Sequence, residues 1–221
     1  MTNFANARRK MVDGQVRTSD VTDLRIIEAM LDVPREAFVP EAQRGLAYLD
    51  LDLDVSEGAG GKRYLIKPVV IAKMLQAAEI KATDRVLVVG CATGYAAAVA
   101  ARLAAEVVAT EADPALAARA TTILAGQGAG NVTVVAAAAA AGEPSRAPYD
   151  VIVLDGATEI APDGLYGQLA MGGRLVGVFA AGQPPRVEIV TRSPGDFGNR
   201  PLFDAYAPVL PGMERPAAFV F

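Results

Sequence analysis

The sequence predicts a doubly wound α/β fold, a parallel sheet with helices on both faces. Three observations indicate it. From residue 85 onward, short β-branched runs alternate with helical stretches. These runs are almost continuously apolar, as in parallel strands covered on both faces. One of them breaks on the turn VGCATGY, which opens into a helix of small residues. With 221 residues, 52% of them hydrophobic, the chain can bury a substantial core.

The expected strands follow one another along the second half of the chain. They read RVLVVG, EVVATE, VTVVA, DVIVLD and GRLVGVF, with helices expected around 95–104, 114–125 and 159–169. Two further runs, RVEIVTRS and RPAAFVF, have no long helix between them, which predicts an antiparallel C-terminal edge. Six alanines, 136–141, lie where the third strand becomes a loop.

The first part of the chain is predicted to be helical. The run DLRIIEAMLDV places Leu24, Ile27 and Met30 at helical spacing, and Pro34 ends that helix. The loop SEGAGGKRY precedes a second amphipathic segment, 68–80, which begins on a proline. We expect residues 1–81 to form an N-terminal helical cap with a substrate loop. Residues 82–221 then form the cofactor-type α/β domain, and the two make one compact unit.

Charge and composition narrow the partners and the compartment. The formal net charge is -4 and the basic residues are scattered, which argues against nucleic acid and against an anionic membrane surface. No run approaches 18 apolar residues, and the N-terminus lacks the apolar region of a secretion signal. Cys91 is the only cysteine, which fits a reducing compartment and predicts a cytoplasmic protein.

Histidine is absent from the chain. Its absence removes the commonest general base and the commonest transition-metal ligand. Catalysis by Ser-His-Asp or Cys-His groups is therefore excluded. With a single cysteine as well, a zinc site would need carboxylates alone, so no metal is expected.

The glycine turn is the candidate cofactor cradle. Tyr95 replaces the last glycine of the dinucleotide pattern G-x-G-x-x-G. The spacing of Gly90, Ala92 and Gly94 fits the G-x-G-x-G turn of S-adenosylmethionine-dependent methyltransferases better, and no Walker lysine follows for a nucleoside triphosphate. Glu111 ends the next strand, where a carboxylate can accept hydrogen bonds from both ribose hydroxyls. A glycine turn can also be a plain tight connection, so this motif alone leaves nucleoside binding open.

Beyond the glycine turn, several N-terminal and C-terminal segments point to one family. They are MVDGQVR, VTDLRIIEAMLDVPREAFVPE, LAYLDLDLDV, DRVLVVGCATGYAAAVAARL, and APYDVIVLDGA followed by QLAMGGRLVGVF. Over about residues 11–179 the chain resembles the protein-L-isoaspartate O-methyltransferase family, repair enzymes that methylate isoaspartyl carboxyl groups in aged proteins. The resemblance implies a Rossmann-like methyltransferase sheet, S-adenosylmethionine as cofactor and an isoaspartyl protein or peptide as substrate. It implies cofactor contacts at Gly90, Cys91, Ala92, Thr93, Gly94, Tyr95, Glu111 and Ala137.

The chain departs from the family pattern at four of the positions that carry its chemistry. Ile66, in YLIKP, takes the slot of the family's serine. Val88 stands where the family has an acid, and Ala92 where it has a glycine. Ala137 lies in place of the aspartate that receives the adenine amino group, which leaves Glu111 as the recognisable polar contact. Because a hydrogen bond to a charged group contributes about 1.5 to 3 kcal/mol, we expect weakened or lost cofactor binding.

Three other residues have two interpretations each. Asp155 ends the fourth strand, where it is either a new catalytic or ligand group or a turn cap before Gly156, and we favour the cap. Lys67 either attracts a carboxylate at the pocket mouth or is solvated beside a helix start. Cys91 is expected to be a small packing residue, since no histidine is present to activate it.

Three functions remain open at this point. The first is S-adenosylmethionine-dependent carboxyl methyl transfer to isoaspartyl groups, which depends mainly on positioning because a carboxylate is already a nucleophile. The second is an inactive family member whose weakened or vacant cofactor pocket serves as a binding or regulatory module. The third is methyl transfer to another acceptor, organised by Asp155.

Overall fold

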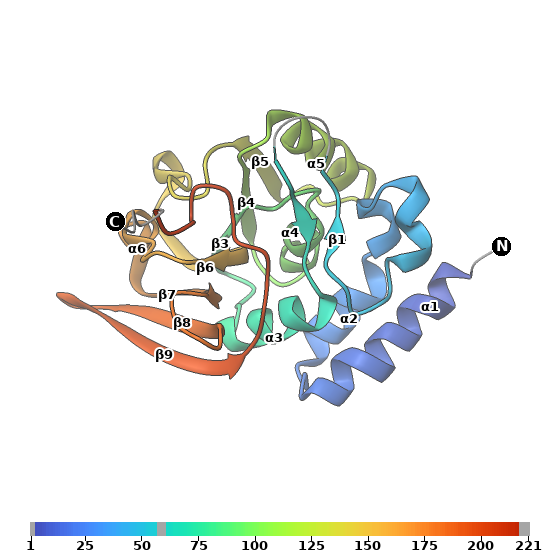
Figure 1. The fold of residues 1–221 in the computed structure, drawn as a ribbon, viewed down its shortest axis with the longest axis horizontal. Helices are drawn as coiled ribbons and strands as arrows, with labels where there is room; N and C mark the ends of the chain where they lie inside the picture. The colour runs from blue at the N-terminus through green and yellow to red at the C-terminus, as the bar shows by residue number, and fades with distance from the viewer. Residues whose placement is uncertain (1–2, 57–60, 217–221) are drawn as a thin grey trace, which may run out of the picture.

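The computed structural model describes residues 3–56 and 61–216. Its centre is a seven-stranded sheet in the order β5-β4-β3-β6-β7-β8-β9 (Figure 1). Strands β3 to β7 are parallel to one another, as the sequence predicts, and β8 and β9 are antiparallel. The strands are β3 (Arg85–Val89), β4 (Glu106–Glu111), β5 (Val132–Ala136), β6 (Tyr149–Thr158), β7 (Leu169–Phe179), β8 (Arg186–Ser193) and β9 (Asp196–Asp204).

The antiparallel edge is confirmed, but its second strand is not the predicted one. RVEIVTRS forms β8, and the chain then turns back over Pro194 and Gly195 into β9. Gly195 has a φ of 81°, which a glycine adopts without strain, so a tight hairpin forms where no strand was expected. Of the predicted strand RPAAFVF, Arg215 and Pro216 are not in a strand, and the remainder lies outside the described residues.

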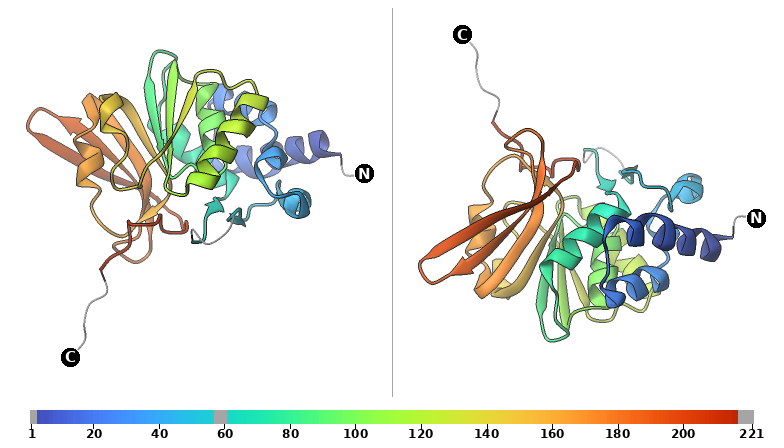
Figure 2. Two further views of the ribbon diagram at one scale, coloured as in Figure 1. Left: turned by 90° about the horizontal axis from the view of Figure 1, so that it is seen from above. Right: turned by 90° about the horizontal axis from the view of Figure 1, so that it is seen from below.

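A layer of helices covers one face of the sheet, here called the first face, and Figure 2 shows this layer from above and from below. Val86 and Val88 of β3 point to this face and share one hydrophobic core with residues of the helices. That core also holds Met11 and Ile26, so the N-terminal cap packs on the same layer. The helices are α1 (Phe4–Met11), α2 (Leu24–Asp32), α3 (Pro68–Ala78), α4 (Tyr95–Ala101) and α5 (Pro114–Gly126).

Short helical turns complete the cap. They are η1 (Val12–Val16), η2 (Arg17–Ser19), η3 (Arg35–Phe38) and η4 (Glu41–Leu46), with η5 (Pro144–Arg146) beyond the cap. Helix α2 begins where the Asp23 side chain accepts a hydrogen bond from the Arg25 amide, and it ends just before Val33 and Pro34. A two-stranded sheet of β1 (Leu53–Asp54) and β2 (Tyr64–Leu65) then leads into α3. The predicted loop SEGAGGKRY joins β1 to β2, and its residues 57–60 lie outside the described residues.

The second face of the sheet has a thinner cover. Leu87 and Val89 of β3 point to this face and belong to a second core cluster, together with Leu165 and Leu210. The helix predicted over 159–169 is shorter in the structure, as α6 (Asp163–Tyr166), because Pro162 and Gly167 flank it. Loops and the segment after β9 therefore supply much of this layer. No helix among the described residues is long and apolar enough to cross a membrane.

Candidate functional site

The glycine turn and Asp155 both lie at the carboxyl edge of the parallel strands. Gly90 directly follows β3, and the β3–β6 register pairs Val89 with Leu154, one residue before Asp155. Gly90 and Gly94 have φ values of 71° and 98°, which only glycine adopts readily. The turn is thus a genuine glycine turn at the edge where open α/β sheets bind ligands.

The Glu111 carboxylate lies at the centre of this edge and is fully buried. The amide of Ala92 donates to Oε2 at 2.7 Å, and the amide of Asp113 donates to Oε1 at 3.2 Å. The Arg63 side chain binds both oxygens, with Nε 3.0 Å from Oε1 and Nη2 3.0 Å from Oε2. Arg63 Nη2 also donates to the Gly90 carbonyl at 2.8 Å. The carboxylate expected to face ribose hydroxyls is therefore already bound by an arginine of the same chain.

The Leu210 side chain fills the space beside the glycine turn. A Cβ added to Gly90 would lie 2.4 Å from Leu210 Cδ2, and a Cβ added to Gly156 would lie 2.7 Å from the same atom. Leu210 is completely buried. It belongs to the segment after β9, which crosses back to the end of β6, where the Ala157 amide donates to the Pro208 carbonyl at 2.8 Å (Figure 1).

Asp155 is not the turn cap that we favoured. It lies within β6, which continues to Thr158, and its Oδ1 has no hydrogen-bond partner among the described residues. Burial raises the pKa of this carboxyl to about 7, although the positive charges of Arg63 and Arg35 act in the opposite direction. Asp155 is therefore a buried group that titrates near neutral pH at the edge of the sheet.

Ile66 occupies its slot as an apolar core residue, 1% exposed. Its carbonyl accepts a hydrogen bond from Arg35 Nη2 at 2.8 Å, and Arg35 Nε donates to the Ala47 carbonyl at 2.9 Å. The Arg35 guanidinium also lies over the Tyr95 ring, 4.7 Å from its centroid. Lys67, next in the chain, is half-buried, and its amide donates to Asp52 at 2.9 Å.

The remaining predicted residues of the turn are packed into the interior. Cys91 is buried, and burial raises the pKa of its thiol well above the ordinary value, so the thiol is protonated and unreactive. The Thr93 hydroxyl donates to the Phe38 carbonyl at 2.5 Å, which ties the turn to the cap. Val88 lies in the core on the helix-covered face. Ala137 is partly exposed just beyond β5, and its amide donates to the Glu111 carbonyl at 3.0 Å.

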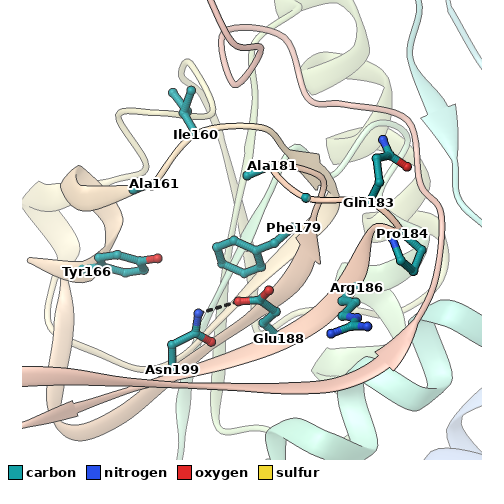
Figure 3. A pocket seen from close by; sticks show the side chains of 11 residues that line it. Ile160, Ala161, Tyr166, Phe179, Ala181, Gln183, Pro184, Arg186, Glu188 and Asn199 are labelled. Carbon is teal, nitrogen blue, oxygen red and sulfur yellow. Dashed lines mark hydrogen bonds between the residues drawn. The ribbon is translucent and has the colours of Figure 1, made fainter.

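A separate pocket of about 440 Å³ lies near the ends of β7 and β8 (Figure 3). Apolar side chains such as Phe179 and Ile160 line it, and Glu188 and Asn199 are hydrogen-bonded to each other at its rim. None of the predicted site residues lines this pocket. The described residues contain no group of three or more side chains arranged to hold a metal ion.

Sequence reasoning missed two residues that define this site, Arg63 and Leu210. The signal for Arg63 was weak, a single arginine after a glycine-rich loop. Leu210 gave no signal, because its position depends on how the segment after β9 crosses the sheet edge.

Comparison with known proteins identifies the lineage. The family model "Protein-L-isoaspartate(D-aspartate) O-methyltransferase" matches residues 6–192. The chain belongs to this family. Protein-L-isoaspartate O-methyltransferases are S-adenosylmethionine-dependent methyltransferases, and the chain is a protein-L-isoaspartate O-methyltransferase-like protein.

Relatives cover most of the chain. It is 40% identical over 194 residues to a protein-L-isoaspartate O-methyltransferase of Roseiflexus sp. (strain RS-1), covering 88% of this chain and 86% of the relative. It is 42% identical over 182 residues to protein-L-isoaspartate O-methyltransferase 1 of Rhodopseudomonas palustris (strain HaA2), covering 82% of this chain and 73% of the relative.

Solved structures show the same fold. A protein-L-isoaspartate O-methyltransferase superposes with a TM-score of 0.83 at 23% identity, covering 93% of this chain and 66% of the longer one. A second structure, from Plasmodium falciparum, gives a TM-score of 0.77 at 17% identity and covers 95% of this chain and 99% of that one. The Plasmodium falciparum protein is in complex with S-adenosyl-L-homocysteine. The predicted α/β methyltransferase fold is thereby confirmed.

Proposed function

We propose that this chain transfers a methyl group from S-adenosylmethionine to the carboxylate of isoaspartyl residues in proteins or peptides. The observation that carries the proposal is the glycine turn at Gly90 and Gly94 beside the buried Glu111 carboxylate, in a chain of this family. Both features lie at the carboxyl edge of the parallel strands, where α/β proteins bind nucleotides.

The Glu111 carboxylate and the glycine turn suit the cofactor, but other side chains of the protein fill the space beside them. Glu111 offers two carboxylate oxygens for a ribose diol, and the glycines allow close approach of a ligand. In this structure Arg63 binds those oxygens and Leu210 packs on the turn, so binding requires both side chains to move. We assign cofactor contacts to Gly90, Cys91, Ala92, Thr93, Gly94, Tyr95, Glu111 and Ala137.

The reaction asks little acid–base chemistry of the protein. The bound cofactor supplies a methyl group on a positively charged sulfur. An isoaspartyl carboxyl group is ionised at neutral pH, so no general base is needed, and orientation of the acceptor provides most of the rate increase. Ile66, in the slot of the family's serine, is buried and provides no hydroxyl contact. Asp155, with a pKa of about 7, is suited to hold a hydrogen bond to the acceptor at neutral pH.

A methyl-transfer assay tests the proposal. The purified chain is incubated with S-adenosylmethionine carrying a labelled methyl group and an isoaspartyl peptide, and base-labile methyl ester is measured. The same peptide with a normal aspartyl linkage is the control for substrate specificity. We expect ester on the isoaspartyl peptide alone and at least tenfold less with Glu111→Gln. Absence of ester at cofactor concentrations that saturate binding would contradict the proposal.

The filled cleft favours a second candidate function, a non-enzymatic binding or regulatory module. The observation behind it is that Arg63 is bound to Glu111 and Leu210 packs against the glycine turn. Calorimetric titration with S-adenosylhomocysteine separates the two functions. Saturable binding below about 1 mM supports the enzyme, whereas no binding at that concentration supports the module.

The same proposal includes the compartment and the partner. We infer a cytoplasmic protein, because its single cysteine is a free, buried thiol. The partner is a protein or peptide with an isoaspartyl residue. The net charge of -4 provides no electrostatic attraction for nucleic acid or for an anionic membrane.

A further inference from the structure

We propose that Arg63 and residues 207–213 form an internal plug of the cofactor cleft, and that the cofactor binds only to molecules in which the plug is displaced. Arg63 provides the polar half of the plug and Leu210 the apolar half. The inference rests on the proposed function, which supplies the class of ligand, a nucleoside bearing an amino acid group.

The polar half competes for the contacts that a ribose would make. Arg63 reaches Glu111 with two nitrogens, each 3.0 Å from a different carboxylate oxygen. A ribose diol needs the same two oxygens for its two hydroxyls. The arginine is 3% exposed and the glutamate is fully buried, so there is no room for both partners at full contact. Because a bidentate arginine–carboxylate pair is among the stronger hydrogen-bonded contacts, Arg63 competes effectively with a ribose for Glu111.

The apolar half fills the approach to the glycine turn. Gly90 directly follows β3 and Gly156 lies in the neighbouring strand β6, and both lack the Cβ that would collide with Leu210. The leucine therefore occupies the volume that the two glycines leave free. A glycine at the turn is useful to a cofactor because a ligand can approach the backbone closely, and Leu210 uses that same approach.

The plug segment is attached in a way that permits release. It follows the last strand, and although its Ala207, Leu210 and Met213 side chains are buried, its ladder pairing with β6 among the described residues is a single parallel bridge between Ala157 and Val209. The Leu210 amide donates to the Ala157 carbonyl at 2.9 Å, and the Glu159 amide donates to the Met213 carbonyl at 2.9 Å. Displacing this segment leaves every ladder of the main sheet in place. Segments with few backbone contacts open at lower free energy than the core.

The plug lowers the apparent affinity for the cofactor without changing the contacts of the open cleft. The apparent dissociation constant equals the intrinsic one divided by the fraction of open molecules. An open fraction of about 1% would weaken binding about a hundredfold. Weak binding by the unmodified chain and strong binding by an opened variant are therefore expected together.

Calorimetric titration with S-adenosylhomocysteine tests the plug in the full chain. We expect the unmodified chain to bind at about 100 μM or weaker. Leu210→Ala should bind at least tenfold more tightly, about 1.4 kcal/mol, and Leu210→Val should lie between the two. Leu169→Ala is the matched control. Leu169 is as buried as Leu210 and belongs to the same core cluster, but it is not among the residues nearest to a Cβ added at Gly90. Its affinity should be unchanged.

Arg63→Ala tests the polar half in the same titration, and we again expect at least tenfold tighter binding. Near-ultraviolet circular dichroism establishes that each variant is folded. If Leu210→Val and Leu210→Ala are folded and bind no more tightly than the unmodified chain, the inference is overturned. Submicromolar binding by the unmodified chain overturns it as well.

Hydrogen exchange gives a readout that does not depend on catalysis. With saturating S-adenosylhomocysteine, the amide of Leu210 should exchange faster than in the free protein, because its bond to the Ala157 carbonyl is broken. Continued protection of this amide in the bound state would refute displacement. Tighter binding by Leu210→Ala without any methyl ester on isoaspartyl peptide would leave the plug standing and refute the proposed activity. Methyl ester formation by the unmodified chain, with no change of cofactor affinity in the variants, would support the proposed activity and refute the plug.

Discussion

Arg63 and Glu111 form a buried ion pair that joins the loop between β1 and β2 to the end of β4, with Nη2 3.0 Å from Oε2. The pair unites two segments 48 positions apart in the sequence. It places a positive side chain on the one polar group of the expected cofactor site that the chain retains. Several measurable properties follow from this pair and its surroundings.

Removal of Arg63 alone should destabilise the fold. Arg63→Met leaves the Glu111 carboxylate buried with backbone donors only, and we expect a loss of about 3 kcal/mol in the free energy of unfolding. The double variant Arg63→Met with Glu111→Gln removes both charges and should recover more than half of that loss. Urea unfolding of the four proteins in this cycle measures both values. A double variant less stable than Arg63→Met would contradict the ion-pair explanation.

Asp155 should make stability depend on pH. Burial raises its pKa from 3.8 to about 7, so the folded protein keeps a proton that the unfolded chain releases. Its contribution to stability is complete below about pH 4 and is lost as the pH rises to about 7. Asp155→Asn should therefore show a smaller fall in unfolding free energy than the unmodified chain between about pH 5 and about pH 8. The exposed Asp50→Asn is the control, and an equal fall in both variants would argue against Asp155.

Two substitutions that restore family residues should differ sharply in their effect on stability. Val88 is fully buried in the core, so Val88→Glu places a carboxyl group in an apolar environment and should destabilise by several kcal/mol. Ala137 is partly exposed beyond β5, so Ala137→Asp should change stability by less than about 0.5 kcal/mol. Thermal unfolding of both variants checks this contrast. Equal destabilisation would contradict the difference in burial between Val88 and Ala137.

Ala92→Gly should stabilise the protein. Ala92 has a φ of 49°, in the left-handed region, where a Cβ costs about 1 to 2 kcal/mol relative to glycine. Glycine also gains freedom in the unfolded chain, which offsets part of the benefit. We expect a net gain of about 0.5 to 1 kcal/mol by urea unfolding. Ala97→Gly, in the middle of α4, is the opposite case and should destabilise by about 1 kcal/mol. A loss of stability in Ala92→Gly would speak against the strained backbone.

Cys91 should react slowly with a maleimide in the folded protein. Its thiol is buried, and burial raises its pKa, so little thiolate is present or accessible. In denaturant the same thiol should be labelled at least a hundredfold faster. Mass spectrometry of samples taken over time gives both rates. Rapid labelling of the folded protein would indicate that the glycine turn is open to solvent.

The carboxyl-edge location of Gly90 and Asp155 could be predicted from the sequence, because strands divided by helices must run parallel and end at the same edge. The role of Asp155 could not be predicted from the sequence, because an aspartate after a strand can equally well cap a turn or be a buried carboxyl group without a partner. The hairpin of β8 and β9 was also missed in part, because one glycine with a positive φ set the turn at Gly195.

Local pattern and spacing were enough to predict the succession of the parallel strands along the chain, the glycine turn, the acid at the end of β4 and the family. What fills the space beside the glycine turn could be read only from the folded chain. Arg63 reaches Glu111, and Leu210 lies between Gly90 and Gly156, only because distant segments are brought together at the sheet edge. No periodicity or spacing encodes such contacts, since they depend on the path of loops and on which buried charge finds a partner.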